Sequence, residues 1–293
     1  MVFSMKKVLI TGAGSYIGNN VEAWLNRWPE KYQVQVLDMQ LSTWREYDFS
    51  DFDTVFHVAG IAHADVGNVS EERKQFYYKI NTDLAIDTAK VAKMQGVKQF
   101  ILMSSMIIYG GKEHVTKDTR PEPANFYGDS KWKADQGIRD LEDSNFKVVV
   151  LRPPMIYGKN SKGNYPVLAK MAKKLPVFPK VKNKRSVLYV ENLSEFVRLM
   201  IENEESGIFY PQNESLVSTA ELVGNIANAH GHKIWMTSIL NPFAAVAKKV
   251  PGKIGNLASK AFGSSYYDME MSRYKDNYII ANNIESIKKT ETE

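Results

Sequence analysis

Cysteine is absent from this chain of 293 residues. Its absence excludes disulfide bonds, thiolate nucleophiles and metal sites built on cysteine. His230 and His232 are separated by one glycine and have no acidic or histidine partner close by in the sequence, so we predict no metal site. Any redox chemistry must therefore come from a bound cofactor.

Long apolar runs are also absent. No segment approaches the roughly 20 apolar residues that cross a bilayer, and no signal-type segment follows Met1. We therefore expect a soluble, cytoplasmic protein without stable membrane insertion. The segment from Phe243 to Phe262 mixes apolar residues with lysines. It is predicted to be a lid or lobe helix, and docking on a membrane surface is the alternative.

Negative charge is missing from one stretch of the chain. The formal net charge is +5, and residues 159–185 contain no aspartate or glutamate. Between Lys159 and Arg185 the chain carries Lys162, Lys170, Lys173, Lys174, Lys180, Lys182 and Lys184. Such a stretch attracts anions. We predict no nucleic-acid partner, because there is no recognition motif and no aromatic interleaving. A diphosphate-bearing substrate is favoured, and a solvated basic face is the alternative.

Short apolar runs alternate with amphipathic helical patterns, which predicts an α/β fold with a doubly wound parallel sheet. The expected buried strands are Val8–Ile10, Val34–Leu37, Thr54–Val58, Phe100–Met103 and Val148–Leu151. The expected helices run from about Tyr16 to Arg27, Glu71 to Gln95, Phe126 to Asp143, Asn192 to Asn203 and Thr219 to His230. The polar tail from Ile287 is expected to fray.

A glycine-rich turn, Thr11–Gly18, joins the first expected strand to the first helix. Backbone amides and the positive end of the helix dipole at such a turn receive a pyrophosphate. Gly12 allows the tight turn, Gly14 allows close backbone approach, and Gly18 allows the helix to pack on the strand. Asp38 ends the second strand, where a carboxylate binds ribose hydroxyls and repels a phosphate, so NAD is favoured over NADP. A plain strand-end role for Asp38 is the alternative.

We predict that the chain consists of two parts. Residues 1–155 are predicted to form the NAD-binding Rossmann domain, with residues 187–203 packing back on it. Several prolines interrupt the regular pattern after Leu151. Residues 156–186 and 204–293 are therefore predicted to form a smaller C-terminal lobe that binds the substrate.

Ser105, Tyr127 and Lys131 form a candidate hydride-transfer triad. Tyr127 and Lys131 are one helical turn apart, so their side chains project from the same face. Free tyrosine has a pKa of about 10, and lowering this pKa to about 7 requires roughly 4 kcal/mol of phenolate stabilisation. A unit charge about 4 Å away in a partly screened site supplies about that much. Ser105 would hydrogen-bond the reacting oxygen. His57 is expected to serve only the strand-end turn.

The sequence resembles the extended short-chain dehydrogenases/reductases, in particular the nucleotide-sugar epimerase/dehydratase branch. The resemblance covers nearly the whole chain. It rests on Thr11–Gly18, Asp48–Phe49, His57–Gly60, Asn81, Ser104–Gly110, Tyr127–Lys131 and Arg152–Gly158.

The resemblance implies roles for further residues. Asp48 and Phe49 would flank the adenine, Ala59 and Gly60 the pyrophosphate, and Pro153 to Ile156 the nicotinamide, while Lys131 would hold the nicotinamide ribose. The cofactor-binding residues implied are Gly12, Gly14, Ser15, Tyr16, Ile17, Gly18, Asp38, Asp48, Phe49, Ala59, Gly60, Asn81, Tyr127, Lys131, Pro154 and Ile156. The substrate-binding residues implied are Ser105, Met106, Asn164 and Arg185. The resemblance also suggests a homodimer formed through the helices near residues 71–95 and 126–143.

Departures from the family pattern narrow the chemistry. Ser15 stands where the family usually has its middle glycine, so the turn differs locally or uses the serine hydroxyl on phosphate. Met106 and Ile107 follow Ser105 where 4,6-dehydratases have Asp-Glu, so elimination of water lacks its acid and base. Epimerisation beside a ketone uses a cysteine and a histidine in this family, and the chain has no cysteine.

The resulting prediction is an NAD-dependent nucleotide-sugar epimerase acting at carbon four of a UDP-hexose. The alternative is an NAD(P)H-dependent 4-reductase of a UDP-linked keto-deoxysugar. A third reading is a non-catalytic dinucleotide-sensing protein, which typically loses the tyrosine or the lysine, whereas this chain retains both.

Overall fold

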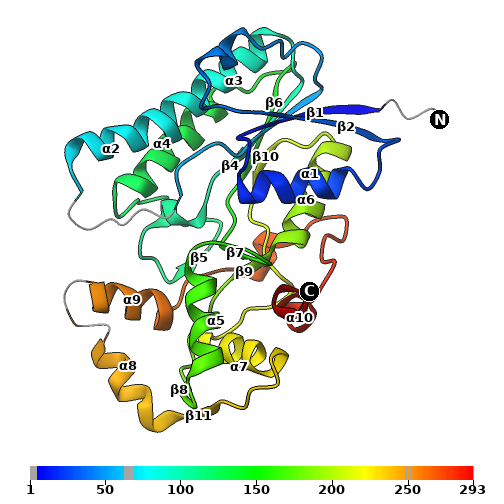
Figure 1. Ribbon diagram of the computed structural model, residues 1–293. Helices are drawn as coiled ribbons and strands as arrows, with labels where there is room; N and C mark the ends of the chain where they lie inside the picture. The colour runs from blue at the N-terminus through cyan, green and yellow to red at the C-terminus, as the bar shows by residue number, and fades with distance from the viewer. Residues whose placement is uncertain (1–4, 63–68, 248–249, 251–252, 293) are drawn as a thin grey trace.

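A parallel sheet of six strands forms the centre of the computed structural model, which describes residues 5–62, 69–247, 250 and 253–292 (Figure 1). The strand order is β10-β6-β4-β3-β1-β2. The strands are β1 (Lys6–Thr11), β2 (Tyr32–Leu37), β3 (Thr54–His57), β4 (Gln99–Met103), β6 (Lys147–Leu151) and β10 (Gly207–Phe209). All their pairings are parallel, which confirms the doubly wound α/β fold. The order reverses between β1 and β3, and ligands of such sheets bind outside the carboxyl ends at this point.

Alternation along the strands builds two apolar layers. In β1, the Val8 and Ile10 side chains join one core cluster, with helices α1 (Tyr16–Leu25) and α6 (Val190–Glu202). Leu9 points to the other face and packs with α3 (Leu84–Met94) and α4 (Phe126–Arg139). Figure 1 shows these two groups of helices on opposite sides of the sheet. The sheet is therefore covered on both faces, as its apolar strands require.

The helix expected from Glu71 to Gln95 is not uniform. It consists of α2 (Glu71–Tyr78), a π-helical turn (Lys79–Asp83) and α3. The π-helical turn contains Asn81, whose side chain is tied to Ile61 outside the helix. Single π-turns of this kind frequently occur at functional sites. The expectation of one regular helix was wrong at this turn.

Helix α4 ends four residues earlier than expected. Its last residue is Arg139, and the chain then turns at Asp143, whose carboxylate accepts the amides of Asn145 and Phe146. Asp143 competes with the helix because its side chain satisfies these amides locally. The turn leads directly into β6.

Most of the chain after β6, apart from α6 and β10, forms the lower part of Figure 1. Its helices are α5 (Asn164–Lys174), α7 (Thr219–Ala229), α8 (Asn241–Ala247), α9 (Lys253–Phe262) and α10 (Asn283–Thr292). Short parallel pairs join β7 (Met155–Tyr157) to β9 (Val187–Tyr189), β8 (Val177–Pro179) to β11 (Trp235–Thr237), and β5 (His114–Val115) to β12 (Tyr266–Tyr267). The 3-10 turns are η1 (Ser42–Glu46), η3 (Met106–Tyr109), η4 (Ser238–Leu240) and η5 (Met269–Ser272).

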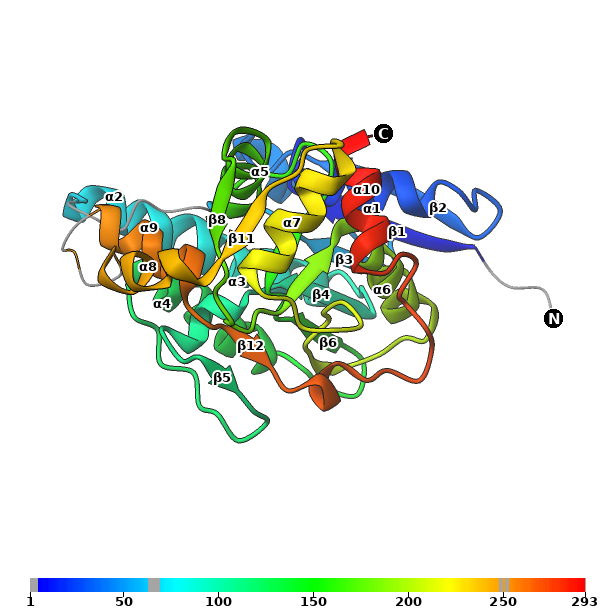
Figure 2. The ribbon, with the colours of Figure 1, turned by 90° about the horizontal axis from the view of Figure 1, so that it is seen from below.

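In the second half, one strand was not anticipated and one expectation was wrong. Strand β10 pairs with β6 in the main sheet, although residues 204–293 were assigned to the lobe. Only three residues long, β10 carries too little pattern to be recognised. The tail does not fray from Ile287, because α10 buries that side chain to 1 % exposure. Figure 2 shows α10 beside α7, with which it packs.

The segment from Phe243 to Phe262 is two helices, α8 and α9, in the residues that the structure describes. Within those residues, no helix combines the length and the apolar character needed to cross a bilayer.

Candidate active site

The glycine turn joins the carboxyl ends of three strands. The Gly12 amide donates to the Leu37 carbonyl at the end of β2, at 2.9 Å. A Cβ added to Gly12 would lie 2.8 Å from the Ala59 amide nitrogen beyond β3, and Gly12 has a φ of +117°. Gly14 has a φ of +72°. Only glycine satisfies both the close approach and the positive φ at residue 12. The predicted pyrophosphate residues Gly12, Ala59 and Gly60 thus surround the β1/β3 switch point.

Helix α1 presents its amino end to this turn. Ser15 is the N-cap, and its Oγ accepts the Gly18 amide at 3.1 Å. The Ser15 hydroxyl proton is not used in that bond, and the first amides of the helix, those of Tyr16 and Ile17, have no intrahelical acceptor. A Cβ on Gly18 would lie 2.5 Å from the Ser15 Oγ, so glycine is required for the cap. The serine that replaces the family's middle glycine therefore organises the anion-binding end of the helix.

The Tyr16 side chain points away from these amides. Its hydroxyl is buried, has no hydrogen-bond partner in the described residues, and lies where a Cβ of Gly158 would be 2.6 Å away. Burial raises the pKa of Tyr16.

Asp38 lies half-buried immediately after β2, beside the glycine turn. Its Oδ1 accepts the Gln40 amide at 2.9 Å, which orients the carboxylate and leaves Oδ2 for ribose hydroxyls. Asp48 is exposed, and hydrogen bonds from Ser50 lower its pKa. The Phe49 ring is fully buried in the core, so the predicted adenine contact of Phe49 is restricted to its main chain.

Lys131 points into the protein at the carboxyl end of β4. Its Nζ lies 3.5 Å from the Met103 carbonyl oxygen. A Cβ added to Gly60 would be 2.9 Å from this Nζ and 3.0 Å from the Asn81 Oδ1. Burial lowers the pKa of Lys131 to about 8. The structure therefore brings together three predicted residues, Lys131, Gly60 and Asn81, that lie far apart in the sequence.

Asn81 holds this arrangement in place. Its Oδ1 accepts the Ile61 amide at 2.8 Å, and its Nδ2 donates to Ser130 Oγ at 3.2 Å. Asn81 is 1 % exposed. Asn81 thus connects the loop after β3 to α4 through Ser130, the residue before Lys131. Asn81 therefore positions the site through the loop and the helix that it joins.

Tyr127 lies in the first turn of α4, which Asn125 caps by accepting the Gly128 amide at 3.0 Å. A Cβ added to Gly128 would be 3.0 Å from the Ile107 carbonyl oxygen, so this turn packs closely on η3, which follows Ser105. The Tyr127 ring lies 6.1 Å from that of Tyr77 in α2. Burial, with a smaller contribution from Tyr77, raises the pKa of Tyr127 to about 12.

This raised pKa differs from the expectation that Lys131 lowers the pKa of the Tyr127 phenol toward about 7. The reason is geometric, because the Lys131 amine approaches the Met103 carbonyl and burial favours the neutral phenol. In the protein alone, Tyr127 is a proton donor. Activation toward the phenolate requires additional positive charge beside its oxygen.

Ser105 follows β4 as the N-cap of η3, and its Oγ accepts the Ile107 amide at 3.3 Å. No direct hydrogen bond joins the Ser105 and Tyr127 hydroxyls in the described residues. The Met106 amide donates to the Pro153 carbonyl at 2.9 Å, and the Ser265 hydroxyl lies 3.2 Å from the Met106 sulfur. Ser105 and Met106 therefore lie where the sheet meets the C-terminal segment.

The remaining predicted residues lie below the sheet. Pro154 is buried, and Ile156 belongs to β7. Asn164 is exposed at the first position of α5, after Gly163 with a φ of +93°. Arg185 is half-buried, donates to the Gly263 carbonyl at 3.1 Å, and has its pKa lowered by burial. Arg185 thus joins the basic stretch to the segment after α9.

Sequence reasoning missed a buried ion pair beside the triad. Arg152 forms a two-pronged contact with Asp135, with Nε–Oδ2 and Nη2–Oδ1 distances of 2.8 Å. Asp135 also accepts the Ser104 hydroxyl at 3.1 Å. Asp135 lies one helical turn after Lys131, and this spacing on the Tyr127 face was the available signal. The pair ties α4 to the loops that carry Ser105 and Pro153.

His57 is the other side chain whose environment was not predicted. Its Nδ1 lies 2.7 Å from the Thr11 hydroxyl, and its Nε2 is buried without a partner in the described residues. Burial, helped by the nearby Lys131 charge, lowers the pKa of His57 to about 3. The imidazole is therefore neutral, in agreement with the strand-end role expected for it.

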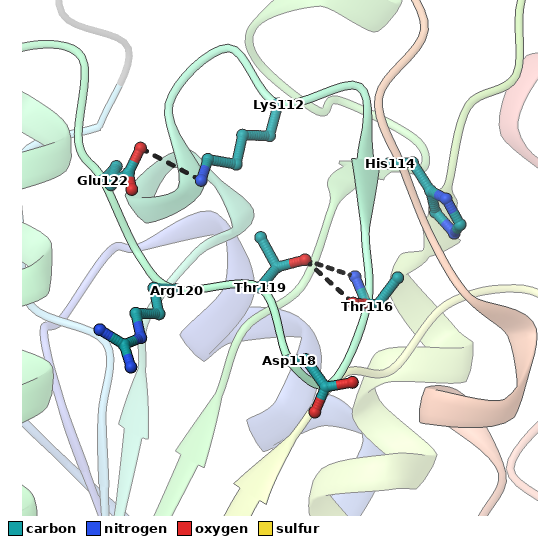
Figure 3. Close-up of a pocket in the computed structure, with 7 residues that line it drawn as sticks. All are labelled: Lys112, His114, Thr116, Asp118, Thr119, Arg120 and Glu122. Carbon is teal, nitrogen blue, oxygen red and sulfur yellow. Dashed lines mark hydrogen bonds and ion pairs between the residues drawn. The ribbon is translucent and has the colours of Figure 1, made fainter.

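Two surface cavities lie apart from this group. One of about 370 Å³ lies in the loop after η3 and is lined by the residues in Figure 3, where Lys112 faces Glu122 and Thr119 binds Thr116. The other, of about 390 Å³, lies at the amino ends of β3 and β4. Neither is lined by a predicted site residue. In the described part of the chain, no three histidine or acidic side chains gather as metal ligands would.

The chain is similar to characterised sugar epimerases. It is 28 % identical to a UDP-glucose 4-epimerase of Vibrio cholerae over 80 % of this chain and 79 % of that protein. It is 25 % identical to the N-acetyl-alpha-D-glucosaminyl-diphospho-ditrans,octacis-undecaprenol 4-epimerase of Escherichia coli O157:H7, over 88 % of this chain and 82 % of that protein.

Solved structures share the fold. The UDP-N-acetylglucosamine 4-epimerase of Bacillus cereus superposes with a TM-score of 0.75 at 16 % identity, over 98 % of both chains. A dTDP-4-dehydrorhamnose reductase of Clostridium acetobutylicum gives a TM-score of 0.72 at 18 % identity, over 97 % of this chain and 98 % of that one. The model of the NAD dependent epimerase/dehydratase family matches residues 8–210. The resemblance inferred from the motifs is thus confirmed: the chain belongs to the NAD dependent epimerase/dehydratase family and is an NAD-dependent enzyme.

Proposed function

We propose that the protein is an NAD-dependent 4-epimerase of a UDP-linked hexose. The observation that carries the proposal is the placement of Lys131. Its amine is buried at the carboxyl edge of the sheet, next to Gly60 and Asn81, on the α4 face that also carries Tyr127. A solvent-exposed lysine would serve solubility, whereas a buried amine that forms no ion pair in the described residues and contacts only the Met103 carbonyl fits a site for a polar ligand.

The residues present fit NAD. Gly12 and Gly14 have positive φ, the amino end of α1 carries free amides, and Asp38 retains one free carboxylate oxygen. We propose that Gly12–Gly18 holds the pyrophosphate, Asp38 the adenosine ribose, and Lys131 the nicotinamide ribose. When bound, NAD supplies reversible hydride transfer and a positive charge near the phenol.

Tyr127 would remove the proton from the sugar hydroxyl and return it after the sugar has presented its other face. Ser105 would hydrogen-bond the same oxygen as it becomes carbonyl-like. Burial raises the pKa of Tyr127 to about 12, so the phenolate would need the positive charge that a bound nicotinamide supplies. Proton transfer therefore depends on charge gathered around Tyr127 only in the loaded site.

The substrate diphosphate would lie over the basic stretch. Asn164 would contact the diphosphate from the start of α5, and Arg185 would contact it from the segment that is bound to the Gly263 carbonyl. The relatives act on hexoses carried by a diphosphate, linked to uridine in one name and to undecaprenol in the other. We propose uridine as the carrier for this chain.

A 4-reductase of a UDP-linked keto-deoxysugar is the second candidate. The same Ser105, Tyr127 and Lys131 would serve it, and reductases are among the structures that share the fold. In this case Tyr127 only donates a proton, as its raised pKa suits. The two candidates differ in whether the cofactor is consumed.

The test begins with identification of the dinucleotide retained by purified protein. Interconversion of UDP-glucose and UDP-galactose, or of their 2-acetamido forms, without net consumption of NADH supports the epimerase. Consumption of NADH only with a keto-sugar nucleotide supports the reductase. Tyr127→Phe is expected to lower turnover roughly 10²–10⁴-fold. Tyr78→Phe, which removes only a hydroxyl bound to Asp129, is the matched control. Full turnover by Tyr127→Phe would revive the non-catalytic dinucleotide sensor.

We also infer a cytoplasmic homodimer. The dimer rests on the family resemblance and would use α2, α3 and α4, where Phe76 is 45 % exposed. Sedimentation is expected to give twice the chain mass for the native protein and a smaller mass for Phe76→Glu. An unchanged mass for Phe76→Glu would show that the dimer interface does not include Phe76.

A further inference from the structure

The lower tip of the molecule carries an apolar edge made of Trp235, Ile239, Phe243 and Val246. These side chains are 65 %, 73 %, 70 % and 64 % exposed. Trp235 lies in β11, Ile239 in η4, and Phe243 and Val246 in α8. Figure 1 shows these elements at the end of the lobe that is farthest from the sheet. Large exposed apolar side chains gathered in this way mark an interaction surface.

The spacing shows that this edge is a single face. Ile239, Phe243 and Val246 follow each other at intervals of four and three residues through η4 and α8, so they project in the same direction. The opposite face of α8 packs inward, where Ala244 is 5 % exposed. The apolar side of the helix is therefore its outer side, the reverse of a helix that serves only the core.

Positive charge surrounds this edge. The Lys180 amide donates to the Thr237 carbonyl, and the Lys180 carbonyl accepts the Asn241 side chain, so the basic stretch lies directly beside the edge. Lys233 precedes Trp235 by two residues. The sequence contains no aspartate or glutamate in residues 159–190 or 222–267, and β8 of the first segment pairs with β11 of the second. A surface with this charge attracts anions.

We propose that the apolar edge and its lysines dock the protein on an anionic lipid surface. An outward apolar helix face with tryptophan and phenylalanine, bordered by lysines, is the composition of helices that lie in a membrane interface. Anionic headgroups attract the lysines, and the edge enters the headgroup boundary without spanning the bilayer. The alternative occupant, a second copy of this chain, would bring two lysine-rich surfaces together. The proposal is independent of the sugar substrate.

Trp235 offers a direct measurement. Of the five tryptophans, Trp24 and Trp44 are buried and Trp28 and Trp132 are half-buried, so Trp235 is the one placed to enter lipid. Vesicles containing phosphatidylglycerol are expected to shift its emission to shorter wavelength, and brominated lipids to quench it. Both signals should disappear in Trp235→Phe. Pure phosphatidylcholine vesicles and high salt are expected to weaken binding.

The decisive comparison uses Ile239→Ser/Phe243→Ser. This variant is expected to bind phosphatidylglycerol vesicles at least tenfold more weakly in co-sedimentation, with unchanged thermal unfolding. Ile284→Ser, at a site of 68 % exposure on α10, is the matched control and should bind like the native protein. Equal vesicle binding by the double variant, or no quenching of Trp235, would overturn the proposal. Loss of a dimer in the double variant without any vesicle binding by the native protein would assign the edge to a second copy instead.

Discussion

At the scale of single residues, the site depends on how closely the chain passes the Lys131 amine. Gly60 is exposed, yet the space where its side chain would lie is taken by the Lys131 Nζ and the Asn81 Oδ1. A methyl group there must displace one of them. Neither motif spacing nor composition reveals such a contact, because it forms between β3 and α4.

Gly60→Ala is therefore expected to lower turnover roughly a hundredfold, the loss typical of a misplacement of about 1 Å. The reason is displacement of the Lys131 amine, so binding of NAD should weaken as well. Steady-state kinetics and NAD titration measure both effects. Gly111→Ala, where no atom lies within 4 Å of the added Cβ, should behave like the native enzyme. Native kinetics in Gly60→Ala would contradict the arrangement around Lys131.

The Lys131 amine should also make stability depend on pH. Burial lowers its pKa to about 8 from 10.5. Between these values the unfolded chain binds more protons than the folded one, so the free energy of unfolding rises with pH. Cofactor-free Lys131→Met should exceed the native protein in stability by about 1–3 kcal/mol at about pH 7, and the difference should shrink toward pH 10.5.

Urea unfolding across this pH range measures the effect. Lys133→Met removes an exposed lysine paired with Asp129 and is the matched control. A pH trend in Lys133→Met equal to that in Lys131→Met would assign the trend to general charge rather than to the buried amine.

At the scale of elements, α10 shows why the sequence misjudged the end of the chain. The helix is rich in polar residues, and its single inward stripe includes Ser286 and Ile287. The Ser286 hydroxyl is within 2.6 Å of the Tyr157 hydroxyl, and Asn283 binds Asn213 at 2.7 Å. These partners come from two other segments. A short stripe of this kind is visible only when the elements that cover it are in place.

Ile287→Ala is expected to lower the free energy of unfolding by about 2–4 kcal/mol, because it leaves a cavity in a packed site. Ile284→Ala, in the same helix but 68 % exposed, should change it by less than about 0.5 kcal/mol. Chemical denaturation of both variants tests the point. Equal, small effects of the two variants would show that α10 is not packed on the protein and that the tail frays.

At the scale of the whole molecule, the two parts of the chain share one of the core clusters. The cluster that contains Val8 also contains Leu193 and Tyr278, so N-terminal and C-terminal residues pack together. Arg152 adds a polar link, since it binds Asp135 of α4 and the Tyr109 hydroxyl, while its carbonyl accepts the Tyr267 hydroxyl. We therefore expect a single cooperative unfolding transition.

Arg152→Met should lower the free energy of that transition by about 2–3 kcal/mol, because it removes both hydrogen bonds of Arg152 to the buried Asp135 carboxylate and leaves Arg139, at 2.9 Å, as its ion-pair partner. The double variant Asp135→Leu/Arg152→Met should lose less than Arg152→Met alone, because no buried carboxylate remains and only the partly exposed Arg139 loses its partner. Arg45→Met, which breaks an exposed pair with Asp87, should cost less than about 1 kcal/mol. Two separate transitions in the native protein would show that the parts unfold independently.

The sequence by itself determined five of the six strands of the sheet, the glycine turn and the residues proposed as a triad. Buried parallel strands are continuous apolar runs, and a strand–glycine–helix turn is a local structure, so both are readable from neighbouring residues. The tertiary structure alone decided the rest. The raised pKa of Tyr127, the buried Lys131 amine, the Asp135–Arg152 pair and the outward apolar edge of α8 depend on which distant segments pack together. Burial and close contact are properties of the folded chain, and a linear pattern does not contain them.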